Sequence, residues 1–248
     1  MPFIRRLSEA DAVDAGYPNY RVVMMASPES ATVVACFLGD NGHPPMHVHD
    51  VDLCYVVLAG TATVRLGHDT HQARVGELIF IPAGIAHGSD NHSGAAEQHL
   101  EILLPGVRPG APYLRPVDSA DPVGSPAGAP YITSVTGDPD ETLGHERRWT
   151  LADASKGVGA ATIASVERAG AEDTGPVVTL DTDRLLVVTE GQLDTEIAGE
   201  PSVVPAQAVV LIPAGVPHRV WNAAVAPARY LDAELQAPAM YAKLALTD

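Results

Sequence analysis

Two histidines separated by a single residue are the first feature of the chain that could do chemistry. His47 and His49 flank Val48, and side chains at alternate positions of a β-strand point to the same side. On a strand, both imidazoles therefore face one space, while Val48 faces away from it. Neutral imidazole is a ligand for Zn, Fe, Ni and Cu, so the pair predicts a transition-metal site without selecting the metal.

A third histidine lies in a segment that the chain contains twice. IPAGIAHGSDN (81–91) holds His87, and IPAGVPHRVWN (212–222) holds His218. Five pairs of identical residues are separated by the same offset of 131 positions: Gly60 and Gly191, Pro82 and Pro213, Gly84 and Gly215, His87 and His218, and Asn91 and Asn222. This gap-free repeat indicates that each half of the chain is one copy of the same structural unit.

The elements that must position these histidines are short β-strands. Runs rich in Val, Ile and Thr are interrupted by Gly and Pro at short intervals, which is typical of an all-β sandwich or small barrel. YVVLAG (55–60) followed by TATVRL (61–66), for example, predicts two strands that meet at a glycine. Because Pro and Gly are frequent between the two copies, we predict an N-terminal domain over 1–110, a linker over 111–130 and a C-terminal domain over 131–248.

These spacings resemble the two sequence motifs of the cupin superfamily. His47, His49 and Gly60 fall where the first motif places its His-x-His pair and its glycine. The second motif is matched at every spacing, by Gly76, Pro82, Gly84, His87 and Asn91. The resemblance implies an all-β bicupin, with two tandem double-stranded β-helix (jelly-roll) barrels. It further implies that His47, His49 and His87 together hold one divalent transition metal per chain.

The N-terminal copy departs from the cupin motif at one ligand position. Cupins usually place a glutamate ligand where this chain has Leu53. Two carboxylates are alternatives for a fourth ligand: Asp52, if a β-bulge turns it inward, and Glu101, on a later strand of the same copy. If neither reaches the ion, three neutral imidazoles leave its double positive charge uncompensated. That would favour an anionic substrate that can chelate the ion.

The C-terminal copy lacks most of the metal-binding positions. The counterparts of His47, His49, Leu53 and His87 are, in that order, Val178, Leu180, Arg184 and His218. A single histidine does not hold a metal, so we predict a degenerate, metal-free C-terminal domain with a structural role. The alternative is that Arg184, His218 and Trp221 line a second pocket for an anionic ligand.

Three residues are candidates for proton transfer beside the ion. His43 precedes the His-x-His pair in a proline-rich segment, and His99 and Glu101 lie two residues apart and so share a strand face. Specificity is expected to come from inward-facing side chains, among them Leu53, Tyr55 and Phe80.

The composition excludes some classes of partner. The chain has 15 Lys and Arg against 31 Asp and Glu, a net charge of −16, and such a surface repels phosphate backbones and anionic membranes. No segment reaches the roughly 20 apolar residues of a membrane span, and the start does not resemble a signal peptide. We therefore expect a cytoplasmic protein without nucleic-acid or membrane partners, with Cys36 and Cys54 as reduced core thiols.

Three classes of function remain. The first is a dioxygenase in which Fe(II) chelates a small anionic substrate (an enolate, phenolate or thiolate) with O₂, and Zn, Ni, Mn and Cu are alternative metals. The site is similar to that of cupin dioxygenases acting on thiols and β-diketones, which also lack the usual carboxylate. The second class is non-oxidative isomerisation, cyclisation or decarboxylation, and the third is metabolite binding without turnover. Because bicupins often pair, we also expect a homodimer.

Overall fold

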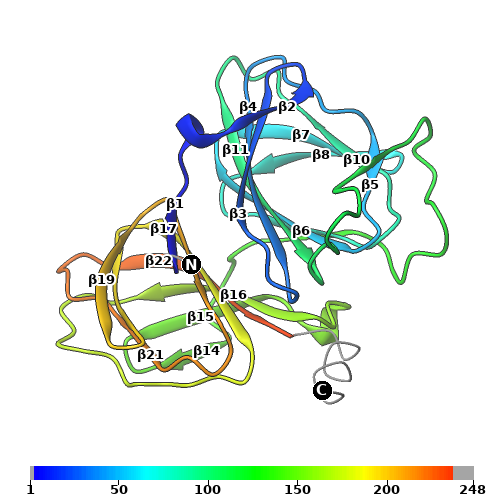
Figure 1. The fold of residues 1–248 in the computed structure, drawn as a ribbon. Helices are drawn as coiled ribbons and strands as arrows, with labels where there is room; N and C mark the ends of the chain where they lie inside the picture. The colour runs from blue at the N-terminus through cyan, green and yellow to red at the C-terminus, as the bar shows by residue number, and fades with distance from the viewer. Residues whose placement is uncertain (1–2, 237–248) are drawn as a thin grey trace. The chain divides into compact units, whose positions relative to one another are not determined.

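The computed structural model describes residues 3–236, which form two compact units built of β-strands (Figure 1). The N-terminal unit comprises Ser8–Ser134. The C-terminal unit comprises the chain from Val135 onwards together with the first strand, β1 (Ile4–Arg6). Helical structure in the described residues amounts to two short 3-10 turns, η1 (Glu9–Asp11) and η2 (Ala154–Lys156). The prediction of an all-β chain with two tandem units is confirmed.

Two antiparallel sheets make up the N-terminal unit. The larger sheet has seven strands, in the order β13 (Tyr131–Thr133), β9 (Leu78–Ile81), β6 (Asp52–Ala59), β11 (Glu97–Leu104), β4 (Thr32–Leu38), β3 (Tyr20–Ala26) and β2 (Val13–Tyr17). The smaller sheet has five, in the order β12 (Arg115–Pro116), β5 (His47–Val48), β10 (His87–Asp90), β7 (Thr61–Leu66) and β8 (Asp69–Arg74). The described strands thus form a two-sheet jelly-roll sandwich rather than one closed ladder.

The hydrophobic core of the N-terminal unit lies between these two sheets. Its main cluster takes Leu53 from β6 and Leu103 from β11 on one side, and Val64 and Leu66 from β7 on the other. Alternate residues on one strand share a face, so the residues of these strands at the same parity also point inward. Leu66 is the cross-strand partner of His87, and cross-strand partners share a sheet face. His87 therefore points into the same interior as this cluster.

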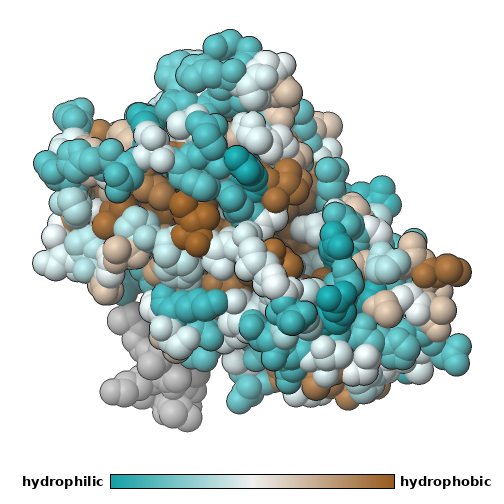
Figure 2. All heavy atoms as spheres, turned by 180° about the vertical axis from the view of Figure 1, so that it is seen from behind, coloured by the Kyte–Doolittle hydropathy of each residue, from teal (hydrophilic) through white to brown (hydrophobic). Residues whose placement is uncertain are grey.

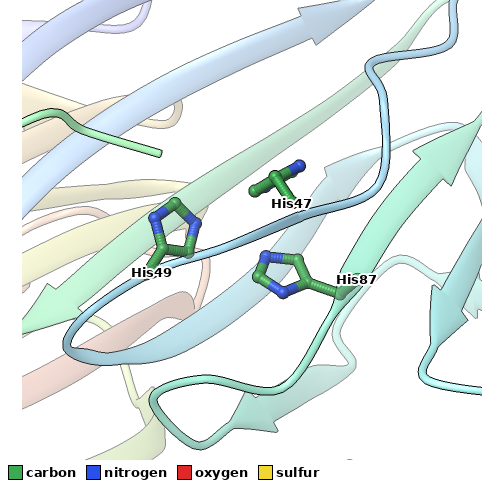
Figure 3. A group of neighbouring side chains, drawn as sticks. All are labelled: His47, His49 and His87. Carbon is green, nitrogen blue, oxygen red and sulfur yellow. The ribbon is translucent and has the colours of Figure 1, made fainter. Parts of the chain in front are cut away.

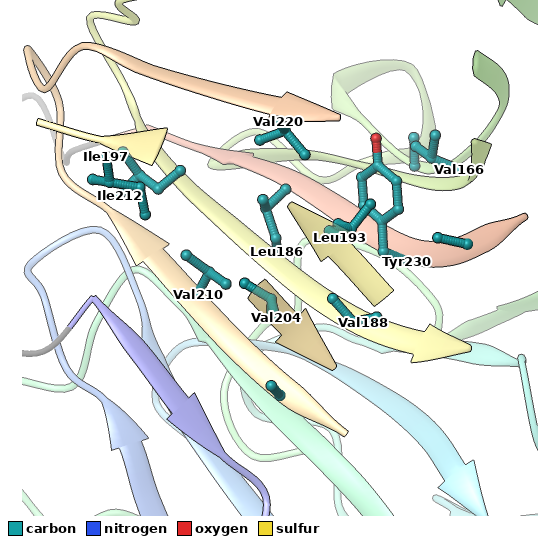
Figure 4. Close-up of a cluster of buried hydrophobic side chains, with 13 residues drawn as sticks. Val166, Leu186, Val188, Leu193, Ile197, Val204, Val210, Ile212, Val220 and Tyr230 are labelled. Carbon is teal, nitrogen blue, oxygen red and sulfur yellow. The ribbon is translucent and has the colours of Figure 1, made fainter. Parts of the chain in front are cut away.

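The C-terminal unit repeats the larger sheet strand for strand, and its smaller sheet has three strands instead of five. Its larger sheet runs β1, β20 (Ala208–Ile212), β17 (Asp183–Glu190), β22 (Ala228–Leu235), β16 (Ala161–Arg168), β15 (Glu146–Ala152) and β14 (Glu141–Leu143). Its smaller sheet runs β19 (Glu200–Pro205), β18 (Gln192–Ile197) and β21 (His218–Trp221). Figure 4 shows the buried cluster between them, in which Leu186 and Val188 of β17 join Leu193 and Ile197 of β18.

The boundaries of the units differ from the predicted ones. β1 pairs with β20, with Ile4 opposite Val210, so the first strand belongs to the C-terminal unit and not to a domain over 1–110. The segment predicted as a linker over 111–130 is packed on the N-terminal unit, where β12 pairs with β5 and the Val123 N–H donates to the Gly84 carbonyl. Strands of two or three residues show no alternation, so the sequence pattern did not reveal them.

The surface carries few large apolar side chains. The face drawn in Figure 2 is mostly hydrophilic or neutral, with apolar residues in small groups. No helix of the described residues is long and apolar enough to cross a membrane. Cys36 and Cys54 are both free and buried, in agreement with the prediction of two core thiols.

Candidate metal centre

Two neighbouring strands bring the three predicted histidines together. β5 carries His47, β10 carries His87, and these residues are direct cross-strand partners. His49 follows β5 and lies on the same side as His47, because Val48 between them points the other way. Figure 3 shows the three rings turned toward one another from these two segments. All three histidines are buried, at 4% or less exposure.

Hydrogen bonds to backbone carbonyls fix the orientation of each ring. Nδ1 of His47 and Nδ1 of His87 each lie 2.9 Å from the carbonyl oxygen two residues earlier, and Nδ1 of His49 lies 2.7 Å from the Tyr113 carbonyl oxygen. Because a carbonyl only accepts, each Nδ1 carries the hydrogen and donates it. In the neutral ring Nε2 is then left with a lone pair, which is the form in which histidine binds a metal.

The three Nε2 atoms are buried and have no hydrogen-bond partner. One ring nitrogen of each histidine lies within 4.8 Å of those of the other two, close enough for donors that share one ion at metal–nitrogen distances near 2.1 Å. Burial lowers the pKa of all three imidazoles, most strongly for His87, so they are neutral donors near neutral pH. This donor set fits a divalent transition metal, which His47, His49 and His87 would hold.

The residues at and beside the usual carboxylate position do not join this group. Leu53 is fully buried in the core cluster. Asp52 begins β6, and its Oδ1 accepts a hydrogen bond from the Ala83 N–H at 2.9 Å. Asp183 accepts from the Ala214 N–H at 2.9 Å in the C-terminal unit. The carboxylate of Asp52 therefore holds the backbone of the turn before His87, as Asp183 holds the matching turn in the C-terminal unit, and no bulge at Asp52 turns it toward the histidines.

Glu101 is a buried carboxylate on the inner face of β11, 4% exposed. Its charge acts on all three histidines, since it raises the pKa of each against the larger effect of burial. Oε2 of Glu101 accepts a hydrogen bond from the Tyr113 hydroxyl, and the Tyr113 ring lies edge-on to His49 with centroids 5.3 Å apart. Tyr113 thus joins Glu101 to a ligand histidine. The sequence did not single out Tyr113, because it lies in the predicted linker.

His99 lies between two glutamates in the same interior. Its Nδ1 is 2.8 Å from Glu97 Oε2 and its Nε2 is 3.7 Å from Glu101 Oε1, and the Tyr55 ring stacks on it at 4.0 Å. Burial alone would lower the pKa of His99, but Glu97 and its other neighbours raise it well above the ordinary value. His99 is therefore a buried cation. Cys36 lies in a group with His99 and Glu101, and burial raises the pKa of its thiol to about 11.

Two other predicted residues lie elsewhere. His43 is exposed, and its Nδ1 is 3.0 Å from the Asn41 carbonyl oxygen. Phe80 lies on the opposite face of β9 from the residues of the core cluster, and its ring contacts Tyr131 with centroids 5.2 Å apart. The structure brings neither of them to the histidine group, whereas Tyr55 does face the interior.

In the C-terminal unit a guanidinium stands beside the retained histidine. His218 forms a bridge with Val178, as the N-terminal histidines pair across β5 and β10. Its Nδ1 lies 2.9 Å from the carbonyl oxygen two residues earlier, and its Nε2 lies 3.1 Å from Arg184 Nη1. Arg184 also donates to both carboxylate oxygens of Asp232, at 2.8 and 2.9 Å. His218 therefore has a partner on Nε2 that comes from the chain itself.

Arg184 also lines a cavity of about 490 Å³, together with Arg168 and Glu172. Neither His218 nor Trp221 lines this cavity, so the pocket differs from the one that the sequence suggested. Arg168 is paired with Glu172 at 2.6 Å, and Arg184 is paired with a carboxylate as described. The cavity walls thus carry balanced charges rather than the excess of positive charge that an anionic ligand favours.

Comparisons with known proteins agree with the repeated architecture. A search of the curated proteins found no match. Among solved structures, a Pseudomonas aeruginosa protein described as glyoxylate-induced has a TM-score of 0.71 and 18% identity, over 93% of this chain and 85% of that chain. Ylba of E. coli has a TM-score of 0.67 and 14% identity, over 91% and 86%. The Mn(II)-containing oxalate decarboxylase of Bacillus subtilis has a TM-score of 0.66 and 14% identity, over 97% and 83%.

At these identities the likeness to solved structures concerns the fold. The family is shown by the sequence itself, because the model of the cupin domain matches it twice, at residues 36–101 and 173–234. The first match contains all three ligand-type histidines, and the second contains His218. The two matches together span more than half of the chain, one in each unit, and the chain therefore belongs to the cupin family as a protein with two cupin domains.

Proposed function

We propose that the N-terminal cupin is a metal-dependent enzyme, in which His47, His49 and His87 hold one divalent transition metal and a small anionic organic molecule is the substrate. The observation that carries this proposal is the set of three buried Nε2 atoms without hydrogen-bond partners. Each unpartnered buried polar atom costs about 1–3 kcal/mol. Three of them converging on one point are accounted for by a shared ion.

The reaction we favour is oxidative cleavage of the substrate by O₂, with Fe(II) as the metal. A ferrous ion held by three imidazoles supplies open positions for both substrate and O₂. The chain's own part is to keep the three donors neutral, so that positive charge is left to attract an enolate, phenolate or thiolate. The apolar cluster that includes Leu53 and Leu66 shares the interior with the histidines.

A second candidate is non-oxidative chemistry on an enolisable or carboxylate substrate. The observation that favours it is Glu101, a carboxylate held by the Tyr113 hydroxyl on the inner face of β11. Burial would raise the pKa of Glu101, but His99 beside it lowers the pKa to about 2. Glu101 is thus ionised and able to accept a proton from a substrate bound beside it. One protein of the same fold is an oxalate decarboxylase.

The metal assignment is tested by elemental analysis of single variants. We expect about one transition-metal ion per chain in the wild-type protein and in His218→Ala, and a near-complete loss in His47→Ala and His49→Ala. The reason is that the first two histidines are ligands, whereas Nε2 of His218 already accepts a hydrogen bond from Arg184. Equal metal loss from all three variants would contradict the assignment of the site to the N-terminal unit.

Oxygen consumption separates the two candidate reactions. The metal-free protein is reconstituted with Fe(II) without air, and an oxygen electrode then follows O₂ uptake across a panel of β-diketones, phenols and thiols. Substrate-dependent uptake that disappears in His47→Ala supports the dioxygenase. Turnover of a carboxylate or enolisable substrate without O₂ uptake would replace it by the second candidate.

A further inference from the structure

The strands β6, β9 and β11 and the pairing of His47 with His87 share one register with their C-terminal counterparts, so the residues in these pairings have defined structural counterparts. Four pairings in the N-terminal unit recur at the offset of 131 residues in the C-terminal unit. Glu101–Tyr55 corresponds to Asp232–Leu186, Leu53–Ile81 to Arg184–Ile212, Leu53–Leu103 to Arg184–Glu234, and His47–His87 to Val178–His218. The counterpart of Glu101 is therefore Asp232, and the counterpart of Leu53 is Arg184.

In the C-terminal unit a single cation joins the counterparts of His87 and Glu101. Those counterparts are His218 and Asp232, and the guanidinium of Arg184 is bonded to both, at 3.1 Å to Nε2 and at 2.8 and 2.9 Å to the two carboxylate oxygens. Asp232 is 3% exposed. In the C-terminal unit, a positive charge thus lies between His218 and the carboxylate of Asp232 on β22.

In the N-terminal unit the same space receives no charge from the counterpart of Arg184, which is Leu53. The basic side chain beside Glu101 there is His99, whose Nε2 lies 3.7 Å from Glu101 Oε1 without a hydrogen bond and whose Nδ1 lies 2.8 Å from Glu97 Oε2. Glu101 accepts its hydrogen bond from the neutral hydroxyl of Tyr113, whereas Asp232 accepts from the guanidinium of Arg184. A buried carboxylate is unfavourable without a compensating cation.

Tyr113 ties this carboxylate to the metal ligands. Its hydroxyl donates a hydrogen bond to Glu101, and its backbone carbonyl accepts one from the ring Nδ1–H of His49. One residue therefore orients both a ligand imidazole and the carboxylate. Such supports beside a metal site fix the geometry of the ligands and tune the affinity of the site.

We propose that Glu101 is the carboxylate of the metal centre. It comes from β11, because the usual carboxylate position on β6 is Leu53 in this chain. Glu101 faces the metal ion, which takes the place that the guanidinium of Arg184 has in the C-terminal unit. Glu101 does not belong to the group formed by the three histidine nitrogens, so it acts on water or substrate held at the ion rather than as a fourth direct ligand. With Glu101 the ion and its surroundings carry one net positive charge, which suits a singly charged anion as substrate. This inference rests on the proposed metal site.

The first test rebuilds the C-terminal arrangement in the N-terminal unit. In Leu53→Arg the new guanidinium should lie between His87 and Glu101 and weaken Co(II) binding by a factor of about 100 or more, measured by calorimetric titration of the full metal-free chain. Leu53→Met, similar in volume, should bind Co(II) like the wild type. The double variant Leu53→Arg/Glu101→Gln should melt at a lower temperature than Leu53→Arg, because the arginine then lacks its carboxylate. Wild-type Co(II) affinity in a folded Leu53→Arg protein would overturn the proposal.

The second test does not depend on an introduced charge. Glu101→Gln keeps the size of the side chain and its bond with Tyr113, and it should weaken Co(II) binding by roughly 10–100-fold. Asp52→Asn, in which a carboxylate of the same unit is removed from a turn, should stay within about twofold of the wild type. If Glu101→Gln binds Co(II) as tightly as the wild type does, this inference is wrong while the metal site stands. If the wild type binds no metal, the proposed function itself is wrong.

Discussion

The orientation of the histidine that both units retain is set by the backbone. His218 has Val178 and Leu180 where the N-terminal unit has its other two ligands. Its Nδ1 nevertheless lies 2.9 Å from the carbonyl oxygen two residues earlier, the same distance as for His87. The turn before the strand therefore aims Nε2 inward in both units. The proposed metal site would in this way be organised before an ion binds.

Asp232 gives the C-terminal unit a pH dependence that can be measured. Burial alone would raise the pKa of Asp232, but Arg184 and Arg148 hold it below the ordinary value. A carboxyl group of this kind stabilises the folded protein above its unfolded pKa of about 3.9, and the stabilisation is lost as the pH falls toward the folded pKa. Asp232→Asn should lower the free energy of unfolding by about 3–5 kcal/mol near neutral pH, and this loss should shrink below about pH 4.

Urea unfolding at several pH values checks this prediction. Glu190→Gln is the matched control, because Glu190 is also on the larger C-terminal sheet but is 65% exposed, and exposed ion pairs contribute about 0–1 kcal/mol. A loss for Asp232→Asn that stays constant down to pH 3 would show that the ionised carboxylate is not what stabilises the unit.

At the residue scale, the sequence predicted the grouping of the three histidines that the structure shows, and it did not single out the residues that support them. The His-x-His pair and the spacing to His87 are local patterns, and strand periodicity converts them directly into positions on one face. Tyr113 contacts His49 and Glu101 only because the fold returns the chain over the smaller sheet, which no local pattern encodes. Asp52 lies beside the expected carboxylate position, but its role in the turn before His87 depends on the pairing of β6 with β9.

The turn before His87 shows how one element can be copied and then diverge. Gly84 and Gly215 both have positive φ, at +81° and +77°, a conformation that favours glycine. A Cβ on Gly84 would also lie 2.3 Å from the Val123 carbonyl oxygen, whereas a Cβ on Gly215 would meet nothing within 4 Å. The N-terminal turn is therefore covered by the segment around Val123, and the C-terminal turn is open.

This difference predicts unequal costs for the same substitution. Gly215→Ala should destabilise the protein by about 1–2 kcal/mol, the cost of the left-handed conformation alone. Gly84→Ala should cost clearly more, because the Val123 carbonyl must also move. Denaturant unfolding of the two variants measures both losses. Equal losses would mean that the segment around Val123 yields without cost.

Elements with a strong internal pattern could be predicted, and short edge strands could not. The all-β class and the two copies follow from composition and repetition. Alternation also predicts the two strands that meet at Gly60, β6 and β7, although these pair in different sheets. β1, β12 and β13 have two or three residues each, too few for a period of two to appear. β1 and β13 lie beside longer strands, β20 and β9, that offer unpaired backbone groups, and β12 pairs with β5, which itself has two residues.

At the scale of the whole molecule, the first strand stabilises the second unit. β1 covers the edge of β20, with Arg5 opposite Val209, and the Leu7 N–H donates to the Gln207 carbonyl at 2.8 Å. Deleting residues 1–7 should speed amide hydrogen exchange in β20 by roughly tenfold or more, because that edge opens to solvent. β9, the counterpart strand, should be unaffected because β13 covers its edge. Unchanged exchange in β20 would contradict a stabilising role for β1.

Because β1 pairs with β20, the C-terminal domain contains chain from both sides of the N-terminal domain. During synthesis β1 leaves the ribosome first, but its partner strand follows about 200 residues later, which at typical elongation rates is roughly ten seconds or more. The C-terminal domain can close only then. Residues 8–134 contain all three histidines, Glu101 and Tyr113, so the nascent chain can bring these side chains together before the domain that surrounds them in sequence has folded.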